Sequence, residues 1–143
     1  MTVKLLFKED VSQIIALYNK DFADGWNAKM LQDAFDGGRF ICAGVFDGDK
    51  LVGVITCSKA VDDADIEGVV TDKDYRRRKI ATTLLDFVTK TLKNDGVKKL
   101  FLEVRESNDS AIAFYQSQGF EKISVRKKYY QDGENALVFV KEI

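Results

Sequence analysis

Apolar residues recur along the chain with two spacings, and each spacing predicts one kind of element. A helical spacing predicts helices centred on Val11–Tyr18, on the residues between Asn27 and Gly37, on Ile80–Leu92 and on Ala111–Tyr115. Runs rich in β-branched and aromatic residues predict strands at Thr2–Phe7, Phe40–Phe46, Leu51–Ser58, Ile66–Thr71, Val97–Val104, Phe120–Val125 and Ala136–Val140. Turns separate these elements, with a hairpin turn at Asp47–Asp49 and a last turn at Tyr129–Glu134.

The order of these elements, β-α-α-β-β-β-α-β-α-β-β, predicts a mixed α/β sheet with helices packed on its faces. The chain has 143 residues, no proline and no low-complexity linker. This length is typical of one domain with its own core. We therefore expect residues 1–143 to form a single domain.

Composition and charge narrow the class of function. Apolar residues make up 45% and charged residues 31% of the chain, as in soluble globular proteins. The net charge of -1 argues against a protein that binds nucleic acid over its whole surface. No apolar run is long enough to span a membrane, and the first residues do not resemble a signal peptide. We therefore expect a cytoplasmic protein with no nucleic-acid and no membrane partner.

The chain contains no histidine. This excludes Ser-His and Cys-His nucleophiles and the usual zinc sites, so a general base must be Asp, Glu, Lys, Tyr, Cys or a water molecule. Cys42 and Cys57 lie within apolar runs, and their spacing matches neither a zinc site nor a disulfide framework. We expect both to be small buried apolar residues, and we expect no metal.

A basic loop joins the Ile66–Thr71 strand to the Ile80–Leu92 helix, and it contains the consecutive cations Arg76, Arg77, Arg78 and Lys79. The first turn of a helix leaves backbone N–H groups unpaired, and that end of the helix is positive, so it binds phosphate. Arginines in the loop add charge-assisted hydrogen bonds. The alternative is a solvated basic turn that binds nothing.

The same segment resembles the cofactor motif of the GNAT family of N-acetyltransferases, Gln/Arg-x-x-Gly-x-Gly/Ala, with Arg76 at its first position and Ala81 at its last. The resemblance implies an α/β (α+β) fold, with a mixed, mostly antiparallel sheet of about seven strands flanked by about four helices. It also implies that two splayed strands bind acetyl-coenzyme A, with loop amides on its pyrophosphate and the preceding strand paired with its pantetheine arm. The implied contacts are Val69, Val70, Thr71, Arg76, Arg77, Arg78, Lys79, Ile80, Ala81 and Thr82.

Lys79 departs from this motif, which has glycine at the same position. Glycine adopts a positive φ readily, and lysine does so less readily. If the backbone is helical at Lys79, the lysine costs little and its ammonium can reach a phosphate. If φ is positive there, the loop is strained.

A second segment resembles the family's other motif, Asn-x-x-Ala-x-x-x-Tyr-x-x-x-Gly-Phe, and the matching residues are Asn108, Ala111, Tyr115, Gly119 and Phe120. Within the family, the chain is similar to the ribosomal-protein-alanine N-acetyltransferases (RimI type). This similarity is carried by Leu102–Tyr115, Arg126, Tyr129, Tyr130, Asp132–Gly133, Glu134–Ala136 and Trp26–Asn27.

This branch implies direct transfer of an acetyl group from acetyl-coenzyme A to the N-terminal α-amine of an alanine-starting ribosomal protein. Asn27, Gly68 and Asn135 depart from the pattern of the branch, so two alternatives stay open. One is acetylation of a small-molecule amine such as an amino sugar or a polyamine, and the other is a sensor that binds acetyl-coenzyme A without catalysis. The paired Glu103 and Tyr115 argue against the sensor, and the Arg-x-x-Tyr-Tyr cluster favours a peptide acceptor.

The resemblance also implies roles for single residues. Glu103 is expected to be the general base, and Tyr115 the general acid toward the sulfur of coenzyme A. Glu103 lies in a strongly apolar strand, where an inward carboxylate needs a partner or a cleft; the alternative is an outward-facing side chain. Glu67 is the rival base, and the alternative for Tyr115 is a core tyrosine. Asn108 can cap the following helix and, by resemblance, contact the coenzyme A arm.

Three further aromatic residues keep two interpretations each. Tyr129 and Tyr130 either shape a peptide cleft or pack the closing hairpin. Trp26 either forms a wall of the substrate entrance or anchors the second helix.

Overall fold

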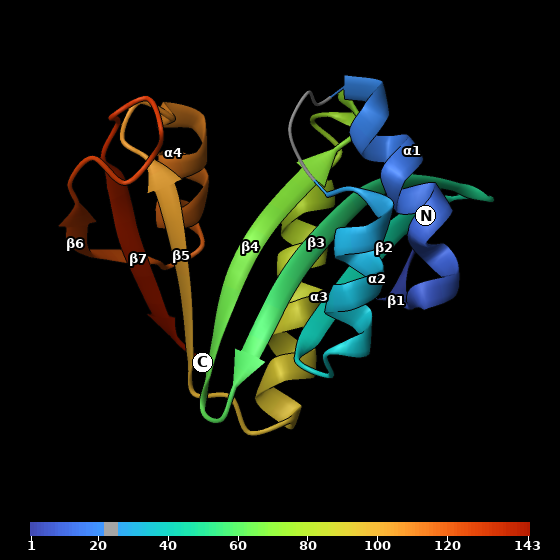
Figure 1. Ribbon diagram of the computed structural model, residues 1–143, viewed down its shortest axis with the longest axis horizontal. Coiled ribbons are helices and arrows are strands. Elements are labelled where there is room, and N and C mark those ends of the chain that lie inside the picture. Colours follow the sequence, from blue (N-terminus) through green and yellow to red (C-terminus); the bar gives the residue numbers. More distant parts are fainter. Residues whose placement is uncertain (22–25) are drawn as a thin grey trace.

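The computed structural model describes residues 1–21 and 26–143, which form one seven-stranded sheet with helices on its faces (Figure 1). The strands are β1 (Thr2–Leu6), β2 (Phe40–Asp47), β3 (Lys50–Ala60), β4 (Asp63–Thr71), β5 (Lys99–Arg105), β6 (Glu121–Arg126) and β7 (Ala136–Glu142). The helices are α1 (Val11–Asp21), α2 (Ala28–Asp36), α3 (Ile80–Asn94) and α4 (Asp109–Ser117), with the short 3₁₀ helices η1 (Lys8–Asp10) and η2 (Lys73–Tyr75). The strands and α-helices follow one another in the predicted order.

Among the described residues, β4 and β5 are the one parallel pair of neighbouring strands, and the sheet divides into two parts between them. Its strand order is β1-β2-β3-β4-β5-β7-β6, and the other neighbouring strands pair antiparallel. β4 and β5 are parallel and pair only between Asp63–Asp65 and Lys99–Phe101. Beyond that junction the two strands diverge as a V (Figure 1). A mixed, mostly antiparallel sheet with two splayed strands confirms the predicted fold.

Helices cover both faces of the part of the sheet that contains β1 to β4. α3 packs on one face, with Leu84 and Val88 buried in a core that continues to α4. α1 and α2 lie on the opposite face (Figure 1), where Ile14 and Leu31 are fully buried. Apolar burial on both faces thereby stabilises this part of the sheet. Such burial is the dominant favourable contribution to folding.

The first turn of α3 approaches the sheet closely at Gly53 of β3. A Cβ atom at Gly53 would overlap Cγ2 of Ile80 and would lie 3.3 Å from Cδ1 of Leu84. Glycine is therefore required for α3 to begin against the sheet. This contact fixes the helix end that follows the basic loop.

β4 begins earlier than the sequence predicts. The expected strand starts at Ile66, whereas the hairpin ladder with β3 already begins at the Ala60–Asp63 pair. The turn before it contains Val61 with a φ of 51°. Asp63 and Asp65 conceal the start of the strand in the sequence because aspartate is depleted in strands.

β4 also carries a bulge at Glu67. Thr56 of β3 pairs with Gly68, whereas Cys57 pairs with Ile66, so Glu67 is an extra residue without an opposite partner in the ladder. A bulge of this kind bends the strand and changes the direction of its side chains. It lies just beyond the residues that pair with β5.

Cys42 and Cys57 are buried free thiols, as the sequence predicts. None of the helices in the described part of the chain is long and apolar enough to cross a membrane. Within residues 1–21 and 26–143, no group of three His, Cys, Asp or Glu side chains is arranged to hold a metal ion.

A buried carboxylate connects α1 to the loop that leaves β4. Asp72 follows β4 directly, and its side chain is 1% exposed. Its carboxylate accepts hydrogen bonds from Nζ of Lys20 at 2.8 and 2.9 Å and from the backbone N–H of Asp74 at 2.9 Å. The hydrogen bond from Lys20 is the main reason that the pKa of Asp72 is lowered. Because Asp72 also caps η2, it sets the path by which the chain enters the basic loop.

Replacing Asp72 with asparagine should lower the melting temperature by about 5 °C at pH 7, because Lys20 loses a charged partner. The pKa of Asp72 is lower in the folded than in the unfolded state, so its contribution is present above about pH 4 and is lost as the pH falls through the folded value. The difference between the parent and Asp72→Asn should therefore narrow in acid.

Thermal unfolding followed by circular dichroism at pH 7 and at pH 3 measures this difference. Asp74→Asn is the control, because Asp74 also binds Lys20 but its side chain is 63% exposed; we expect a small effect. An equal loss for Asp72→Asn at both pH values would contradict the assignment.

Candidate active site

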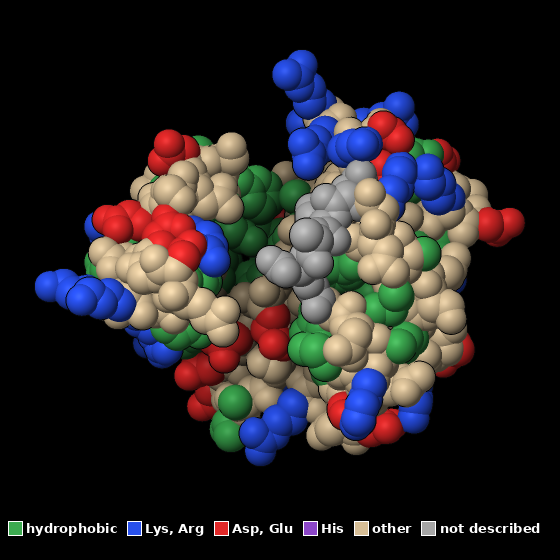
Figure 2. All heavy atoms as spheres, turned by 45° about the horizontal axis from the view of Figure 1, so that its top comes forward, with side chains coloured by type: hydrophobic (Ala, Val, Ile, Leu, Met, Phe, Trp, Pro, Cys, Tyr) green, Lys and Arg blue, Asp and Glu red, His purple; other side chains and the backbone are tan. Residues whose placement is uncertain are grey.

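The divergence of β4 and β5 leaves a cleft between the two parts of the sheet (Figure 2). Along this cleft, Val69, Val70 and Thr71 pair with β3 through one edge of β4 and lie beyond the short ladder with β5 on the other. Their backbone groups on that second edge therefore face the cleft. Two cavities open along it, one of about 540 Å³ at the start of α3 and one of about 470 Å³ beside β5.

The cavity at the start of α3, here called the basic cavity, is formed by the β4–α3 loop, the first turn of α3 and one face of α4. Its lining residues are Thr71, Tyr75, Arg76, Arg77, Lys79, Ile80, Ala81, Thr82, Ser110 and Phe114. The first turn of α3 directs its positive end and its backbone N–H groups to this cavity. The structure thus brings together most of the residues predicted to bind the cofactor.

Four of the predicted cofactor residues lie outside that lining. Val69 and Val70 precede it along the cleft edge of β4. Arg78 is not among the lining residues, and its guanidinium lies 4.9 Å from the centre of the ring of Tyr75, which lines the cavity. Asn108 caps α4 and accepts a hydrogen bond from the backbone N–H of Ala111 at 3.2 Å, which confirms its capping role.

The backbone of the basic loop is left-handed at two positions. Arg77 has a φ of 67° and Lys79 a φ of 58°. Lys79 therefore adopts the conformation that favours the glycine of the motif, which is the strained one of the two alternatives. A left-handed residue followed by a helical one turns successive N–H groups to the same side, which forms an anion-binding concavity. The strain at each such residue costs about 1–2 kcal/mol.

The sequence did not predict Tyr75, Ser110 and Phe114 as lining residues of the basic cavity. The hydroxyl of Tyr75 donates a hydrogen bond to Asp47 at 2.7 Å, which fixes the ring beneath Arg78. Ser110 and Phe114 are one helical turn apart on α4 and therefore share a face. That spacing was the available signal, but only the fold shows that this face lies opposite α3.

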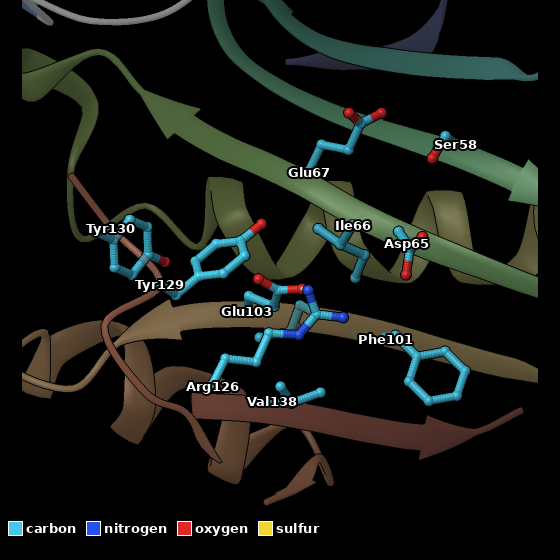
Figure 3. A pocket seen from close by; sticks show the side chains of 11 residues that line it. Ser58, Asp65, Ile66, Glu67, Phe101, Glu103, Arg126, Tyr129, Tyr130 and Val138 are labelled. Carbon is cyan, nitrogen blue, oxygen red and sulfur yellow. The ribbon is translucent and has the colours of Figure 1, made fainter. Parts of the chain in front are cut away.

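The cavity beside β5, here called the acidic cavity, lies between β4, β5 and the connection from β6 to β7 (Figure 3). Its lining residues are Ser58, Asp65, Ile66, Glu67, Phe101, Leu102, Glu103, Arg126, Tyr129, Tyr130 and Val138. The charged groups of this lining are thus three carboxylates and one guanidinium. The cavity carries an excess of negative charge and favours a basic ligand.

Glu103 lies on the face of β5 opposite the buried Leu102 and Val104, and it points into the acidic cavity (Figure 3). Its side chain is 28% exposed, and its Oε1 lies 3.6 Å from the guanidinium of Arg126. Its Oε2 is buried and has no hydrogen-bond partner among the described residues. A buried oxygen in this state is costly unless a ligand satisfies it, so Glu103 is placed to accept a proton or a hydrogen bond.

The rival carboxylate, Glu67, lines the same cavity but points toward Ser58 of β3 (Figure 3). Burial raises the pKa of Glu67, the charge of Asp65 adds to this, and the hydrogen bond with Ser58 opposes it. Burial and the charge of Glu103 also raise the pKa of Asp65. The two candidate bases, Glu67 and Glu103, therefore line one cavity, but their side chains point to different sides of it.

Tyr115 lies on the buried face of α4, where it belongs to the core, and it is not among the lining residues of either cavity. Its side chain is 9% exposed and packs against the rings of Phe114 and Phe120, with centroid distances of 5.1 and 5.5 Å. Burial raises the pKa of Tyr115 to about 12. The phenol is therefore protonated at neutral pH and is able to donate.

Tyr129 and Tyr130 line the acidic cavity, with their rings edge to face at 5.1 Å. They form part of the wall of this cavity, as the interpretation that they shape a peptide cleft requires. Trp26 packs against Phe40 at 5.3 Å and contacts the core that α1 and α2 cover. This contact favours its role as an anchor.

Comparison with known proteins places this fold and cleft in one class. The model of the Acetyltransferase (GNAT) family matches residues 11–120. The chain therefore belongs to the Acetyltransferase (GNAT) family, and it is an acetyl-coenzyme A-dependent N-acetyltransferase. This confirms the resemblance on which the sequence-based expectations depend.

Particular relatives are also similar over nearly the whole chain. The ribosomal protein bS18-alanine N-acetyltransferase of Salmonella typhimurium is 29% identical over 140 residues, which cover 96% of this chain and 94% of that protein. The crystal structure of the corresponding Escherichia coli enzyme has a TM-score of 0.90 and 29% identity, with 99% of this chain and 93% of that chain covered.

Two further proteins share part of the sequence or the fold. A stretch of 72 residues is 46% identical to an N-alpha-acetyltransferase of Saccharolobus solfataricus, and it spans 50% of this chain and 43% of that protein. The PaiA N-acetyltransferase of Thermoplasma acidophilum, solved in complex with coenzyme A, has the same fold with a TM-score of 0.80 at 18% identity, and each chain is covered completely.

Replacing Lys79 with glycine should raise the free energy of unfolding by about 1 kcal/mol, because the relief of the left-handed strain exceeds the entropy that glycine adds to the unfolded chain. Lys79→Ala is the matched control, since it removes the same ammonium but keeps the Cβ atom, and we expect no gain from it. Urea denaturation of both variants measures the difference. Equal stabilisation of the two would show that the charge, rather than the backbone, is responsible.

Proposed function

We propose that this enzyme acetylates the N-terminal α-amine of a protein, most specifically that of an alanine-starting ribosomal protein. The observation that carries this proposal is the acidic cavity, in which the unsatisfied Oε2 of Glu103 lies beside the aromatic wall of Tyr129 and Tyr130. The names of the full-length relatives support the same acceptor. On this proposal residues 1–143 act as one domain, and the enzyme works in the cytoplasm.

The basic cavity is the proposed site for the pyrophosphate of acetyl-coenzyme A. Its left-handed loop and the first turn of α3 supply backbone N–H groups, and Arg76, Arg77 and Lys79 supply positive charge. The cleft edge of Val69–Thr71, which lies beyond the β4–β5 ladder in the described part of the chain, can pair with the amides of the pantetheine arm. Such pairing leads the arm from the basic cavity toward the acidic one.

We propose a direct transfer with Glu103 as the base and Tyr115 as the acid. The neutral α-amine attacks the thioester carbonyl carbon, so that a C–N bond forms and the C–S bond breaks. Glu103 accepts the proton that the amine loses, through a water molecule, and Tyr115 donates its proton to the departing sulfur. An α-amine with a pKa near 8 needs only a modest base.

A small-molecule amine is the second candidate acceptor, and the charge of the acidic cavity favours it. Asp65, Glu67 and Glu103 line this cavity with Arg126 as the single cation among the described residues of its lining, and a polyamine or an amino sugar would meet this excess of carboxylates with its own cations. A peptide is larger than a small-molecule amine and covers more of the apolar area that Tyr129 and Tyr130 add to the cavity. This aromatic wall therefore favours the peptide.

An acceptor screen tests the proposed function. Peptides that begin with alanine or serine should be acetylated faster than peptides that begin with leucine, because a close pocket discriminates by about 1–3 kcal/mol per methylene. N-terminally blocked copies that contain lysine serve as the control for side-chain acetylation, and mass spectrometry locates the acetyl group. Rapid turnover of a polyamine or an amino sugar, with none of the peptides, would replace this proposal by the small-molecule alternative.

Glu103→Gln and Tyr115→Phe should each lower kcat about 100-fold while acetyl-coenzyme A still binds, because both groups act mainly in the transition state. The rate of the parent should rise with pH as the α-amine, whose pKa is near 8, loses its proton. Glu67→Gln is the matched control, since it removes a carboxylate from the same cavity, and we expect a mild effect. A severe loss in Glu67→Gln with nearly normal Glu103→Gln would move the base to β4.

A further inference from the structure

A polar network joins the connection between β5 and α4 to the connection between β6 and β7. Arg105, the last residue of β5, donates from Nη1 to Oδ2 of Asp132 at 2.8 Å and to Oε1 of Glu134 at 3.0 Å. The other carboxylate oxygen of Glu134 accepts the backbone N–H of Ser107 at 2.8 Å. Glu134 therefore binds both the end of β5, at Arg105, and the connection that follows it, at Ser107.

A second set of hydrogen bonds runs parallel to the first. The backbone N–H of Glu106 donates to the carbonyl of Asn135 at 3.1 Å, and the Asn135 side chain donates to the Glu106 carboxylate at 3.0 Å. The Asn135 amide oxygen also accepts the backbone N–H of Lys128 at 3.0 Å. We call Arg105, Glu106, Ser107, Glu134 and Asn135 the clasp.

The clasp holds one wall of the acidic cavity in place. The guanidinium of Arg105 lies 4.0 Å from the centre of the Tyr130 ring, within the range of a cation–π contact. Tyr130 lines the acidic cavity beside Glu103 and contacts the ring of Tyr129. On its other side the clasp ends at Ser107, directly before Asn108, the cap of α4.

The energetics point to a positional role. Arg105 is 43% exposed and Asp132 is 61% exposed, and exposed ion pairs contribute little to stability. Two carboxylates nevertheless hold Nη1 of Arg105 through charge-assisted hydrogen bonds, and the guanidinium held in this way contacts the Tyr130 ring. Three residues of the Asp-Gly-Glu-Asn-Ala segment, which the catalytic scheme does not use, thereby have a structural role: Asp132, Glu134 and Asn135.

We propose that Arg105 and Glu134 are positioning residues for the acceptor, which act by holding Tyr130 at the acidic cavity. The inference rests on the proposed function, because it assigns the acidic cavity to the acceptor. It requires that loss of the clasp weakens acceptor binding and leaves the basic cavity unaffected. It also requires that the effect of Arg105 passes through Tyr130.

The test compares Arg105→Lys and Glu134→Gln with the parent, in steady-state kinetics with an alanine-starting peptide. Each variant should raise the KM for the peptide about tenfold, since small displacements of positioning groups have effects of this order or more, while the KM for acetyl-coenzyme A stays within about twofold. Glu121→Gln is the charge-matched control, because Glu121 is an exposed residue at the start of β6. Unchanged peptide KM values, or equal increases for both substrates, would overturn the proposal.

A double-mutant cycle separates positioning from a merely structural role. In a Tyr130→Ala background, Arg105→Lys should raise the peptide KM by less than about twofold, because residues that act through one another are not additive. A full tenfold increase in that background would show that Arg105 acts independently of Tyr130 and would overturn the proposal.

Amide hydrogen exchange tests, without any acceptor, whether the clasp holds the connection between β6 and β7 in place. In Arg105→Lys and Glu134→Gln, the amides of residues 127–135 should exchange about tenfold faster than in the parent, whereas those of α3 should not change. If the parent acetylates no peptide, the proposed function fails, and exchange alone decides the clasp. Unchanged exchange in the 127–135 segment would then refute it.

Discussion

The short parallel ladder between β4 and β5 is the constraint on which the rest of the site depends. Three residue pairs, from Asp63–Lys99 to Asp65–Phe101, join the strands of the two parts of the sheet, which also share one apolar core. The bulge at Glu67 follows at once and bends β4 away. If pairing continued to Thr71, the edge of β4 would be satisfied by β5, and no cleft would remain for a ligand to enter. Among the described residues, the part of β4 beyond this ladder is therefore paired with β3 only, although sheet edges are usually short, covered or charged.

The two cavities along the cleft carry opposite charge, and separate anchors hold each of them. At the basic cavity, the salt bridge of Asp72 with Lys20 and the close contact of Gly53 with α3 fix the loop and the helix end. At the acidic cavity, Arg105 and Glu134 hold the aromatic wall. A diphosphate and a basic acceptor are therefore attracted to different ends of one cleft. The reacting groups would meet between them.

The sequence predicted the fold well because its two apolar spacings and its two family motifs agree on one topology. It failed at the start of β4, which Asp63 concealed, and it left the backbone of Lys79 open between a helical and a left-handed conformation. The resemblance and the apolar strand around it both indicated Glu103, which the structure places in the acidic cavity, and its role as the base stays a prediction. It could not place Phe114 in the basic cavity or Arg105 over Tyr130, because these contacts exist only after distant segments pack.

The central claim is that one continuous cleft holds the acetyl donor and the amine acceptor at the same time. A bisubstrate conjugate, in which the α-nitrogen of an alanine-starting peptide is joined through an acetyl linker to the sulfur of coenzyme A, tests it by titration calorimetry. Since both parts bind together at high effective concentration, the conjugate should bind at least about tenfold more tightly than coenzyme A alone. Equal affinity for the conjugate and for coenzyme A would contradict the account, because the peptide part would then have no site beside the donor.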